Sequence, residues 1–354
     1  MEEKKDTLGM LDLVIRPGFC VKENQIIKVN QAAESLFITP GTDIRPLLLT
    51  GSEEYAAFTG GCLYLTLNLS SHSCGASVTR VDDIDVFLLE QESDNGELRS
   101  MALAARELRE PLTNVMITAD SLFPLCATED NPRAAEQVAR LNRGLFQILR
   151  IIGNMSDAER CAAVSHQETV DIPALFAEFF EKAEALVSHT GITLTYEGPD
   201  QPIYGLADRE QLERAVLNIL SNAIKFTPKG GTVTAKLTRS GRMLRLSVTD
   251  SGSGIAQSVR SSVFSRYLRQ PALEDSRYGI GLGMVLIRTA AAHHGGAVLI
   301  DQPDGAGTRI TMTMAIRQSK QATLRSNVLR VDYAGERDHG LIELSECLPT
   351  ELYE

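Results

Sequence analysis

The chain has 354 residues, 43% of them hydrophobic and 23% charged, which indicates a folded globular protein of two or three domains. Its formal net charge of −11 argues against nucleic acid or an anionic membrane as the main partner. No apolar run approaches the roughly 20 residues that a membrane-spanning helix needs, and the first residues lack the apolar core of a secretory signal, so we expect a cytoplasmic protein without a membrane span.

Residues 9–90 show the pattern of a small mixed α/β domain. A β-rich segment at Gln25–Val29 follows a Glu23-Asn24 turn, and Asn30 is placed to cap a short helix. Alternating apolar residues then predict three strands, over residues 62–69, 76–81 and 85–89. This order, together with the segment FCVKENQIIKVNQAAESLF, resembles a PAS-type sensor domain. Another small α+β domain is the alternative.

A polar break at residues 91–96 precedes a helical hairpin over residues 97–160. Apolar residues recur at spacings of three and four in two runs, joined by a turn at residues 126–132. The runs comprise Leu98, Met101, Ala105, Leu108, Leu112, Val115, Ala119 and Leu122, and then Val138, Leu141, Leu145, Ile148, Ile152 and Met155. One hairpin leaves its apolar seam open to water, so we expect a homodimer in which two hairpins form a four-helix bundle.

Residues 168–316 read as a separate α/β unit. Helices are predicted over residues 172–186, 208–226 and 282–294, and strands over residues 192–196, 232–238, 244–249, 297–301 and 308–316. The central helix begins with a capping box, because Asp208 is a good N-cap and Gln211 follows three residues later. A tail over residues 317–354 follows, and we expect it to pack on this unit; docking of a partner protein is the alternative.

The central helix carries a polar face beside its apolar stripe. Asn218, Asn222 and Lys225 recur at i, i+4 and i+7, so they share one face. Amide oxygens can ligate Mg²⁺ and a lysine ammonium can meet a phosphate oxygen, so this face suits a metal-bridged polyphosphate. An ordinary exposed polar face would give the same pattern.

Two glycine-rich turns follow the central helix. Asp250 ends a predicted strand, and Gly252 and Gly254 come directly after it. A carboxylate there can accept a hydrogen bond from an exocyclic amine while the glycine backbone approaches a flat ring closely. The second turn runs directly into a helix, where backbone amides can cradle an anion, and it comprises Gly279, Gly281, Leu282 and Gly283.

In order and spacing these segments resemble the ATP-binding catalytic domain of sensor histidine kinases, in the GHKL superfamily. NILSNAIKFTP resembles the N box, DSGSGI the G1 box, VFSRYLR the F box and GIGLGM the G2 box. The resemblance implies that Asn222 ligates Mg²⁺ with support from Asn218, that Lys225 contacts phosphate, and that Asp250 accepts from the adenine amino group. The other motif residues would shape the pocket and its lid: Gly252, Gly254, Phe264, Tyr267, Arg269, Gly279, Gly281, Leu282 and Gly283.

Three positions distinguish this chain from relatives. Gyrase-type ATPases carry a Glu where Asn218 stands, and an amide cannot act as a general base, which favours a kinase over an ATPase. The segment RELREPL resembles the phosphoacceptor sequence His-Glu-Leu-Arg-x-Pro-Leu, but Arg106 replaces the His beside the acidic Glu107. A guanidinium stays protonated and offers no lone pair, so Arg106 should not accept a phosphoryl group. Counting from Ala105 predicts that Arg106 faces outward, and Glu110 stands where many members carry the Thr or Asn that assists dephosphorylation.

The sequence therefore predicts a multidomain α+β protein with a PAS-like sensor, a dimerising hairpin and a GHKL-type α/β sandwich. The predicted function is that of a sensor histidine kinase-like protein of a two-component pathway that binds Mg-ATP, a protein-histidine kinase by family. Arg106 makes standard autophosphorylation doubtful. The alternative is a non-catalytic ATP-binding pseudokinase that regulates a dimerisation partner. A response regulator or another histidine kinase is the partner that the resemblance implies.

Overall fold

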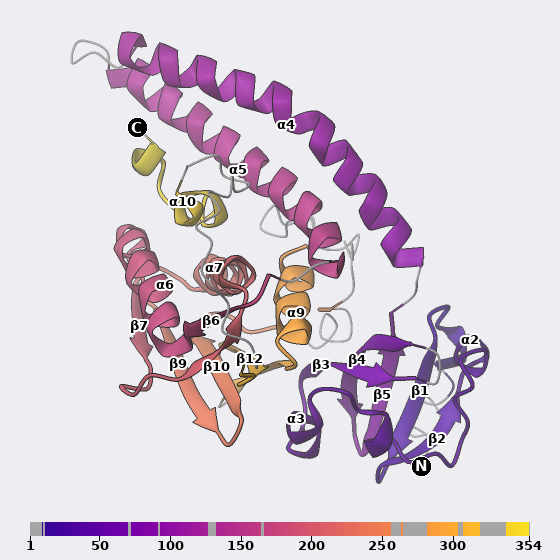
Figure 1. Cartoon of the computed structure of the whole chain (residues 1–354). Helices are drawn as coiled ribbons and strands as arrows, with labels where there is room; N and C mark the ends of the chain where they lie inside the picture. The colour runs from indigo at the N-terminus through magenta and orange to yellow at the C-terminus, as the bar shows by residue number, and fades with distance from the viewer. Residues whose placement is uncertain are drawn as a thin grey trace.

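The computed structural model describes residues 9, 11–69, 72–90, 93–126, 132–163, 166–255, 263–264, 282–303, 307–318 and 338–353. Within those ranges, no helix combines the length and the apolar composition that crossing a membrane requires. Figure 1 shows an N-terminal sheet, a pair of long helices and a C-terminal layer of helices over a second group of strands.

The N-terminal strands pair antiparallel in the spatial order β2-β1-β5-β4-β3. They are β1 (Gly18–Lys22), β2 (Gln25–Val29), β3 (Cys62–Asn68), β4 (Ser73–Val81) and β5 (Ile84–Leu89). The short helices α2 (Gln31–Glu34) and α3 (Ser52–Ala56) lie between β2 and β3 in the chain, with a 3-10 turn at Arg45–Leu47 between them. Another 3-10 turn, at Leu11–Leu13, precedes β1. The predicted strands are confirmed, and so is the turn before β2, where Glu23 and Asn24 have φ of 50° and 64°. Two left-handed residues are the geometry of a tight hairpin.

Asn30 fixes the start of α2, as predicted. Its Oδ1 accepts from the backbone N–H groups of Ala33 and Gly18, both at 3.0 Å. Its Nδ2 donates to the carbonyl of Arg16 at 2.8 Å. One buried amide thus caps the helix and ties it to the residues before β1.

Two long helices, α4 (Ser93–Cys126) and α5 (Pro132–Ala163), lie along each other (Figure 1). The predicted polar break at residues 91–96 is wrong in extent, because α4 already begins at Ser93, a residue type suited to a helix start. In the single chain Leu108 is 51% and Val115 49% exposed, as expected for a seam that one hairpin leaves open. Ala105, Leu112 and Ala119 of the predicted run are buried, and so are Ala102 and Met116, which were not predicted.

The hairpin therefore has two apolar stripes rather than one. On α5, Leu145, Leu149 and Ile152 are buried, whereas Leu141 and Ile148 are 52% and 46% exposed. A straight helix of 3.6 residues per turn drifts away from a strict heptad count, which explains why the predicted positions divide between the two stripes. The side chains of Leu98 and Leu122 lie outside the described residues.

The C-terminal half packs helices on one face of its strands. The strands are β6 (Glu168–Asp171), β7 (Thr193–Glu197), β8 (Tyr204–Ala207), β9 (Thr232–Ser240), β10 (Met243–Asp250), β11 (Val298–Asp301) and β12 (Thr308–Ala315). The helices are α6 (Ile172–Val187), α7 (Arg209–Phe226) and α9 (Gly283–His293), with a 3-10 turn at Ser188–Thr190. Alternate residues of β9 are buried and exposed, so one face of the sheet meets the helices and the other meets solvent. The small β6–β8 pair was not predicted.

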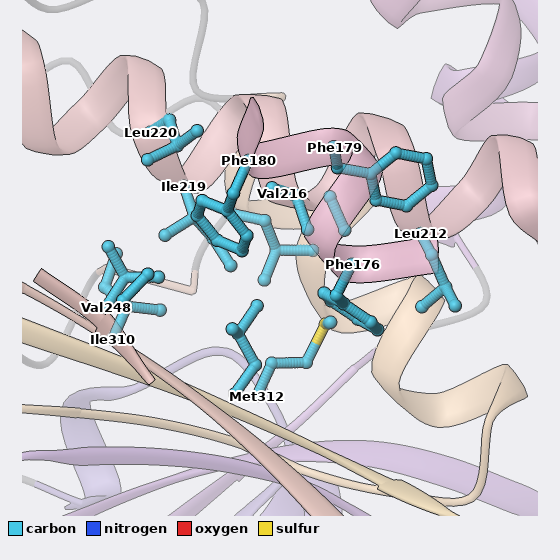
Figure 2. Close-up of a cluster of buried hydrophobic side chains, with 14 of the residues drawn as sticks. Phe176, Phe179, Phe180, Leu212, Val216, Ile219, Leu220, Val248, Ile310 and Met312 are labelled. Atoms are coloured by element: carbon cyan, nitrogen blue, oxygen red, sulfur yellow. The ribbon is translucent and has the colours of Figure 1, made fainter. Parts of the chain in front are cut away.

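Apolar side chains from both layers fill the space between them (Figure 2). Phe176, Phe179 and Phe180 of α6 lie beside the predicted apolar stripe of α7, and Val248, Ile310 and Met312 come from the strands. The tail returns to this half of the molecule. Its helix α10 (His339–Glu343) lies against α5, α6 and α7, and a last 3-10 turn (Thr350–Tyr353) lies against α5. The prediction that the tail packs on the α/β unit is confirmed.

One continuous sheet joins the two halves of the chain. β3 pairs antiparallel with β11, so the strand order runs β2-β1-β5-β4-β3-β11-β12-β10-β9-β7. The junction pairs Tyr64 with Val298, Leu63 with Leu299 and Cys62 with Ile300. The sequence gives no sign of this pairing, since each strand is also a plausible sheet edge by itself.

Candidate nucleotide site

Helix α7 presents the polar face that its sequence predicts. Asp208 caps the helix, and its Oδ1 accepts from the backbone N–H of Gln211 at 3.2 Å. The apolar stripe packs inward, which leaves Asn218, Asn222 and Lys225 on the flank of the helix nearest α9 and the tail. Asn218 is only 1% exposed, so this flank is not the ordinary solvated face that the pattern also allowed.

Asn218 lies between the start of α9 and the tail. Its Nδ2 donates to the carbonyl of Arg214 at 2.9 Å and to Oε2 of Glu343 at 3.3 Å. Its Oδ1 is buried and has no hydrogen-bond partner among the described residues. A Cβ on Gly283 would lie 2.8 Å from that oxygen. The glycine at the start of α9 is therefore what lets the helix approach the amide.

Asn222 and Lys225 occupy the next turns of α7. The Nδ2 of Asn222 lies 3.9 Å from Sδ of Met284, the second residue of α9. The Nζ of Lys225 donates to Oε2 of Glu346 in the tail at 2.7 Å. Burial would raise the pKa of Glu346, but the charges of Arg150 and Lys225 and their hydrogen bonds hold its pKa below the usual carboxyl value. Glu346 is therefore charged at neutral pH, opposite Nζ of Lys225.

Asp250 ends β10 and is 8% exposed. Its Oδ1 accepts from the backbone N–H groups of Gly252 at 2.8 Å and Thr308 at 3.2 Å. Burial raises the pKa of Asp250, and the hydrogen bonds from Gly252 and Thr308 offset only part of that effect. A carboxylate held in place by backbone donors, away from bulk water, is a strong acceptor for a ligand amine.

The glycines after β10 bring this strand end against α7. A Cβ on Gly252 would lie 2.4 Å from the carbonyl oxygen of Phe226, the last residue of α7. Gly254 has φ of +74°, and its Cβ would lie 2.7 Å from Nε2 of Gln302. The strand end that carries Asp250 therefore packs against the C-terminus of α7.

Leu282 has a different environment from the one that its motif suggests. It is 3% exposed and packs in an apolar cluster with Val285, Met101 and Met155, so it joins α9 to the helical hairpin. Four other predicted site residues lie outside the described residues: Tyr267, Arg269, Gly279 and Gly281. The predicted lid over residues 268–278 lies outside them too.

Arg106 and Glu107 lie on α4 and are both exposed. Ala105, directly before them, is 0% exposed and faces α5. The prediction that Arg106 points outward from the seam is therefore confirmed.

Residues 207–318 match the model of a domain family described as histidine kinase-, DNA gyrase B- and HSP90-like ATPases. A sensor-like histidine kinase of Rhizobium meliloti is 29% identical over 276 residues, which cover 73% of this chain and 52% of that protein. The adaptive-response sensory kinase SasA of Synechocystis is 28% identical over 264 residues, 70% of this chain and 68% of SasA. Among solved structures, full-length ShkA in complex with AMPPNP aligns with 70% of this chain and 54% of its own, at 23% identity and a TM-score of 0.51.

The chain is a homologue of sensor histidine kinases. It spans about half of the length of the Rhizobium relative. The likeness to ShkA extends the shared fold beyond the ATPase-like domain. As a histidine kinase homologue, the chain carries a GHKL-type domain over residues 207–318, which include α7, α9 and the strands from β9 to β12.

Sequence reasoning missed several residues of this histidine kinase site. Thr308 donates to Asp250, and its only signal was its place after Gly307 at the start of a strand. Arg150 on α5 and the tail residue Glu346 reach the Lys225 flank from segments that no motif covers.

A further cluster joins the N-terminal sheet to α9, and sequence reasoning missed it as well. Arg288 of α9 is 4% exposed and lies 2.5 Å from Oε1 of Glu90, just after β5. Its guanidinium stands 5.0 Å from the ring centre of Tyr64 on β3 and donates to the carbonyl of Phe264 at 3.0 Å. The carbonyl of Phe264, in the segment that resembles the F box, therefore contacts Arg288, the residue that also contacts Glu90 and Tyr64 of the N-terminal half.

Proposed function

We propose that this chain binds Mg·ATP between α7, the end of β10 and the start of α9. Asn222, with Asn218 beside it, would hold the metal, and Lys225 would meet a phosphate oxygen. Asp250 would accept from the adenine amino group. The residues fit this ligand, because Asn218 presents a buried amide oxygen without a hydrogen-bond partner in the described structure, and amide oxygens suit Mg²⁺. When bound, the metal would neutralise charge on the phosphates.

We propose further that the hairpin does not accept a phosphoryl group on itself. The observation that supports this is the exposed Arg106 in the segment that resembles the phosphoacceptor sequence. A neutral imidazole has a lone pair at pH 7, whereas a guanidinium stays protonated and offers none. The chain would then act as an ATP-binding member of a two-component pathway that signals through its contacts, as a pseudokinase does.

A second candidate is phosphorylation of a partner chain. Asn218 stands where an ATP-hydrolysing relative would need a general base, which favours phosphoryl transfer to a protein over hydrolysis by water. The partner would be a histidine kinase or a response regulator that docks on the hairpin. For either candidate we propose a homodimer through exposed apolar residues of the hairpin, Leu108, Val115, Leu141 and Ile148. Removing these residues from water would supply the free energy of association.

The test combines nucleotide binding with labelling. Calorimetric titration with Mg·ATP should show binding by the natural chain and weaker binding by Asn222→Ala. Incubation with γ-labelled ATP should leave the natural chain unlabelled, whereas Arg106→His should gain a label that is stable to base and labile to acid. Arg133→His, another exposed arginine of the hairpin, is the matched control and should stay unlabelled.

Absence of heat and of a thermal shift with nucleotide would refute the binding site. Acid-labile labelling of the natural chain would refute the role assigned to Arg106. Transfer of label to an added kinase or response regulator, without self-labelling, would select the second candidate over the pseudokinase.

A further inference from the structure

The tail packs against α5, α6 and α7. Its short helix α10 is capped by Asp338, which accepts from the backbone N–H of Leu341 at 3.0 Å. Ile342, Leu344 and Leu348 are each 0% exposed, so the tail is anchored by buried apolar contacts. A segment held in this way is part of the folded structure rather than a loose end.

Side chains of α5 also hold the backbone of the tail. Arg143 donates to the carbonyl oxygens of Ser345 at 3.0 Å and Glu346 at 3.1 Å. Gln147 donates to the carbonyl of Ser345 at 3.2 Å, and Asn142 to that of Tyr353 at 3.1 Å. These bonds fix the position along α5 at which the two tail carboxylates, Glu343 and Glu346, stand.

Glu343 is fully buried between the hairpin and α7. Its Oε1 lies 3.2 Å from Nη2 of Arg214, and its Oε2 lies 3.3 Å from Nε of Arg150 and 3.3 Å from Nδ2 of Asn218. A carboxylate without contact to water needs such partners, because burying an unpaired charge is costly. One of these partners, Asn218, belongs to the nucleotide site.

Glu346 meets the cation of the same site. Its Oε2 accepts from Nζ of Lys225 at 2.7 Å, and its Oε1 lies 3.1 Å from Nη1 of Arg150. Arg150 is itself only 9% exposed and also donates to Oγ of Ser221 on α7 at 3.1 Å. Glu346 thus contacts the ammonium of α7 that a phosphate oxygen would use.

We propose that residues 338–353 form an intrachain inhibitor of the nucleotide site, an inference that rests on the proposed binding of Mg·ATP. Glu346 occupies Lys225, so the docked tail and a nucleotide phosphate compete for the same ammonium. The tail also ties α5 to α7 through Arg150. Because linkage is reciprocal, a bound nucleotide weakens tail docking by the factor by which the tail weakens nucleotide binding.

The experiment compares Mg·ADP binding by the full-length chain and two variants. Glu346→Gln removes the charge opposite Lys225 but keeps the size of the side chain, and Glu346 has 28% of its side chain exposed, so the fold should tolerate it. Glu351→Gln is the matched control, since Glu351 is an exposed carboxylate of the same tail. We expect Glu346→Gln to bind Mg·ADP roughly tenfold more tightly, the ratio that one charge-assisted hydrogen bond supports, and Glu351→Gln to bind as the natural chain does.

Equal or weaker binding by Glu346→Gln, with binding by the natural chain intact, would overturn the inhibitor and leave the nucleotide site standing. Absence of binding by every variant would overturn both. Binding by Glu346→Gln alone would be the strongest support. Amide hydrogen exchange gives a second readout that requires no variant. Saturating Mg·ADP should accelerate exchange in residues 339–353 of the natural chain by at least about tenfold, and unchanged protection would overturn the competition.

Discussion

Replacing Asp250 by asparagine separates the binding role of this residue from its structural role. In the folded chain Oδ1 of Asp250 accepts from two backbone N–H groups, at 2.8 and 3.2 Å. An asparagine keeps an oxygen at that position, so the backbone of the site should persist. The second oxygen becomes an NH₂ group, which cannot accept a hydrogen bond from a nucleotide amine. We therefore expect Asp250→Asn to weaken Mg·ADP binding while the protein stays folded.

The magnitude follows from the charge and the burial of this carboxylate. A hydrogen bond to a charged group contributes about 1.5–3 kcal/mol, which corresponds to a loss of affinity of roughly 10- to 150-fold. In contrast, Asp250→Asn should increase the free energy of unfolding of the nucleotide-free protein. Burial raises the pKa of Asp250 above its ordinary value of 3.8, so ionising it costs folding free energy at neutral pH.

The pH dependence of the free energy of unfolding tests the direction of this effect. Because the pKa of Asp250 is raised in the folded protein, the ionised carboxyl destabilises the fold least below pH 3.8. The destabilisation grows as the pH rises through the folded pKa. The stability gain of Asp250→Asn should therefore be absent in acid and level off near neutral pH. Calorimetry and thermal unfolding measure the two effects, with Asp200→Asn, at an exposed carboxylate, as the control. Unchanged affinity, or a joint loss of affinity and stability, would refute the role of Asp250.

Three further changes test the fold around the site. Gly307→Ala places a Cβ 2.0 Å from a carbonyl oxygen, at φ of +71°, and should lower the free energy of unfolding in denaturant by at least about 1–3 kcal/mol. Gly241→Ala is the control, because its Cβ would meet open space at φ of +56°, and it should cost less. Equal losses would contradict the steric argument. Glu90→Gln leaves the buried charge of Arg288 without its carboxylate and should cost about 2 kcal/mol, seen as faster hydrogen exchange in β3 and β11; unaltered exchange there would contradict it. Burial lowers the pKa of His294 below its ordinary 6.5, so the natural chain should lose stability as the pH falls below 6.5, and His294→Gln should flatten that loss; the same slope in both would count against it.

Local chemistry made much of the nucleotide site predictable. The strands and helices around it follow from short-range apolar periods, and Asp208 and Asn30 cap the helices that their side chains indicate. Asn218, Asn222 and Lys225 share a face because the helix period requires it. These predictions succeeded because each depends on residues within a few turns of one another.

Contacts between distant segments were not predictable in the same way. A heptad count could not decide which apolar residues of the hairpin meet the other helix of the same chain, so the burial of Ala102 and Met116 was not predicted. The tail carboxylates carry no motif, and Glu346 is more than a hundred residues from Lys225 along the chain. Charge and helical spacing alone do not specify a partner at that separation.

The junction between β3 and β11 is the shortest link in a long ladder, since its register extends only from Cys62 to Tyr64, whereas β10 and β12 pair from Met243 to Asp250. If the two halves of the molecule separate, we expect the sheet to break between β3 and β11. Each half will then have an exposed edge strand with unpaired backbone N–H and C=O groups. Exposed edge strands pair with strands of neighbouring molecules. A conformational change that separates the kinase-like half would therefore also create a site where a second molecule can add a strand.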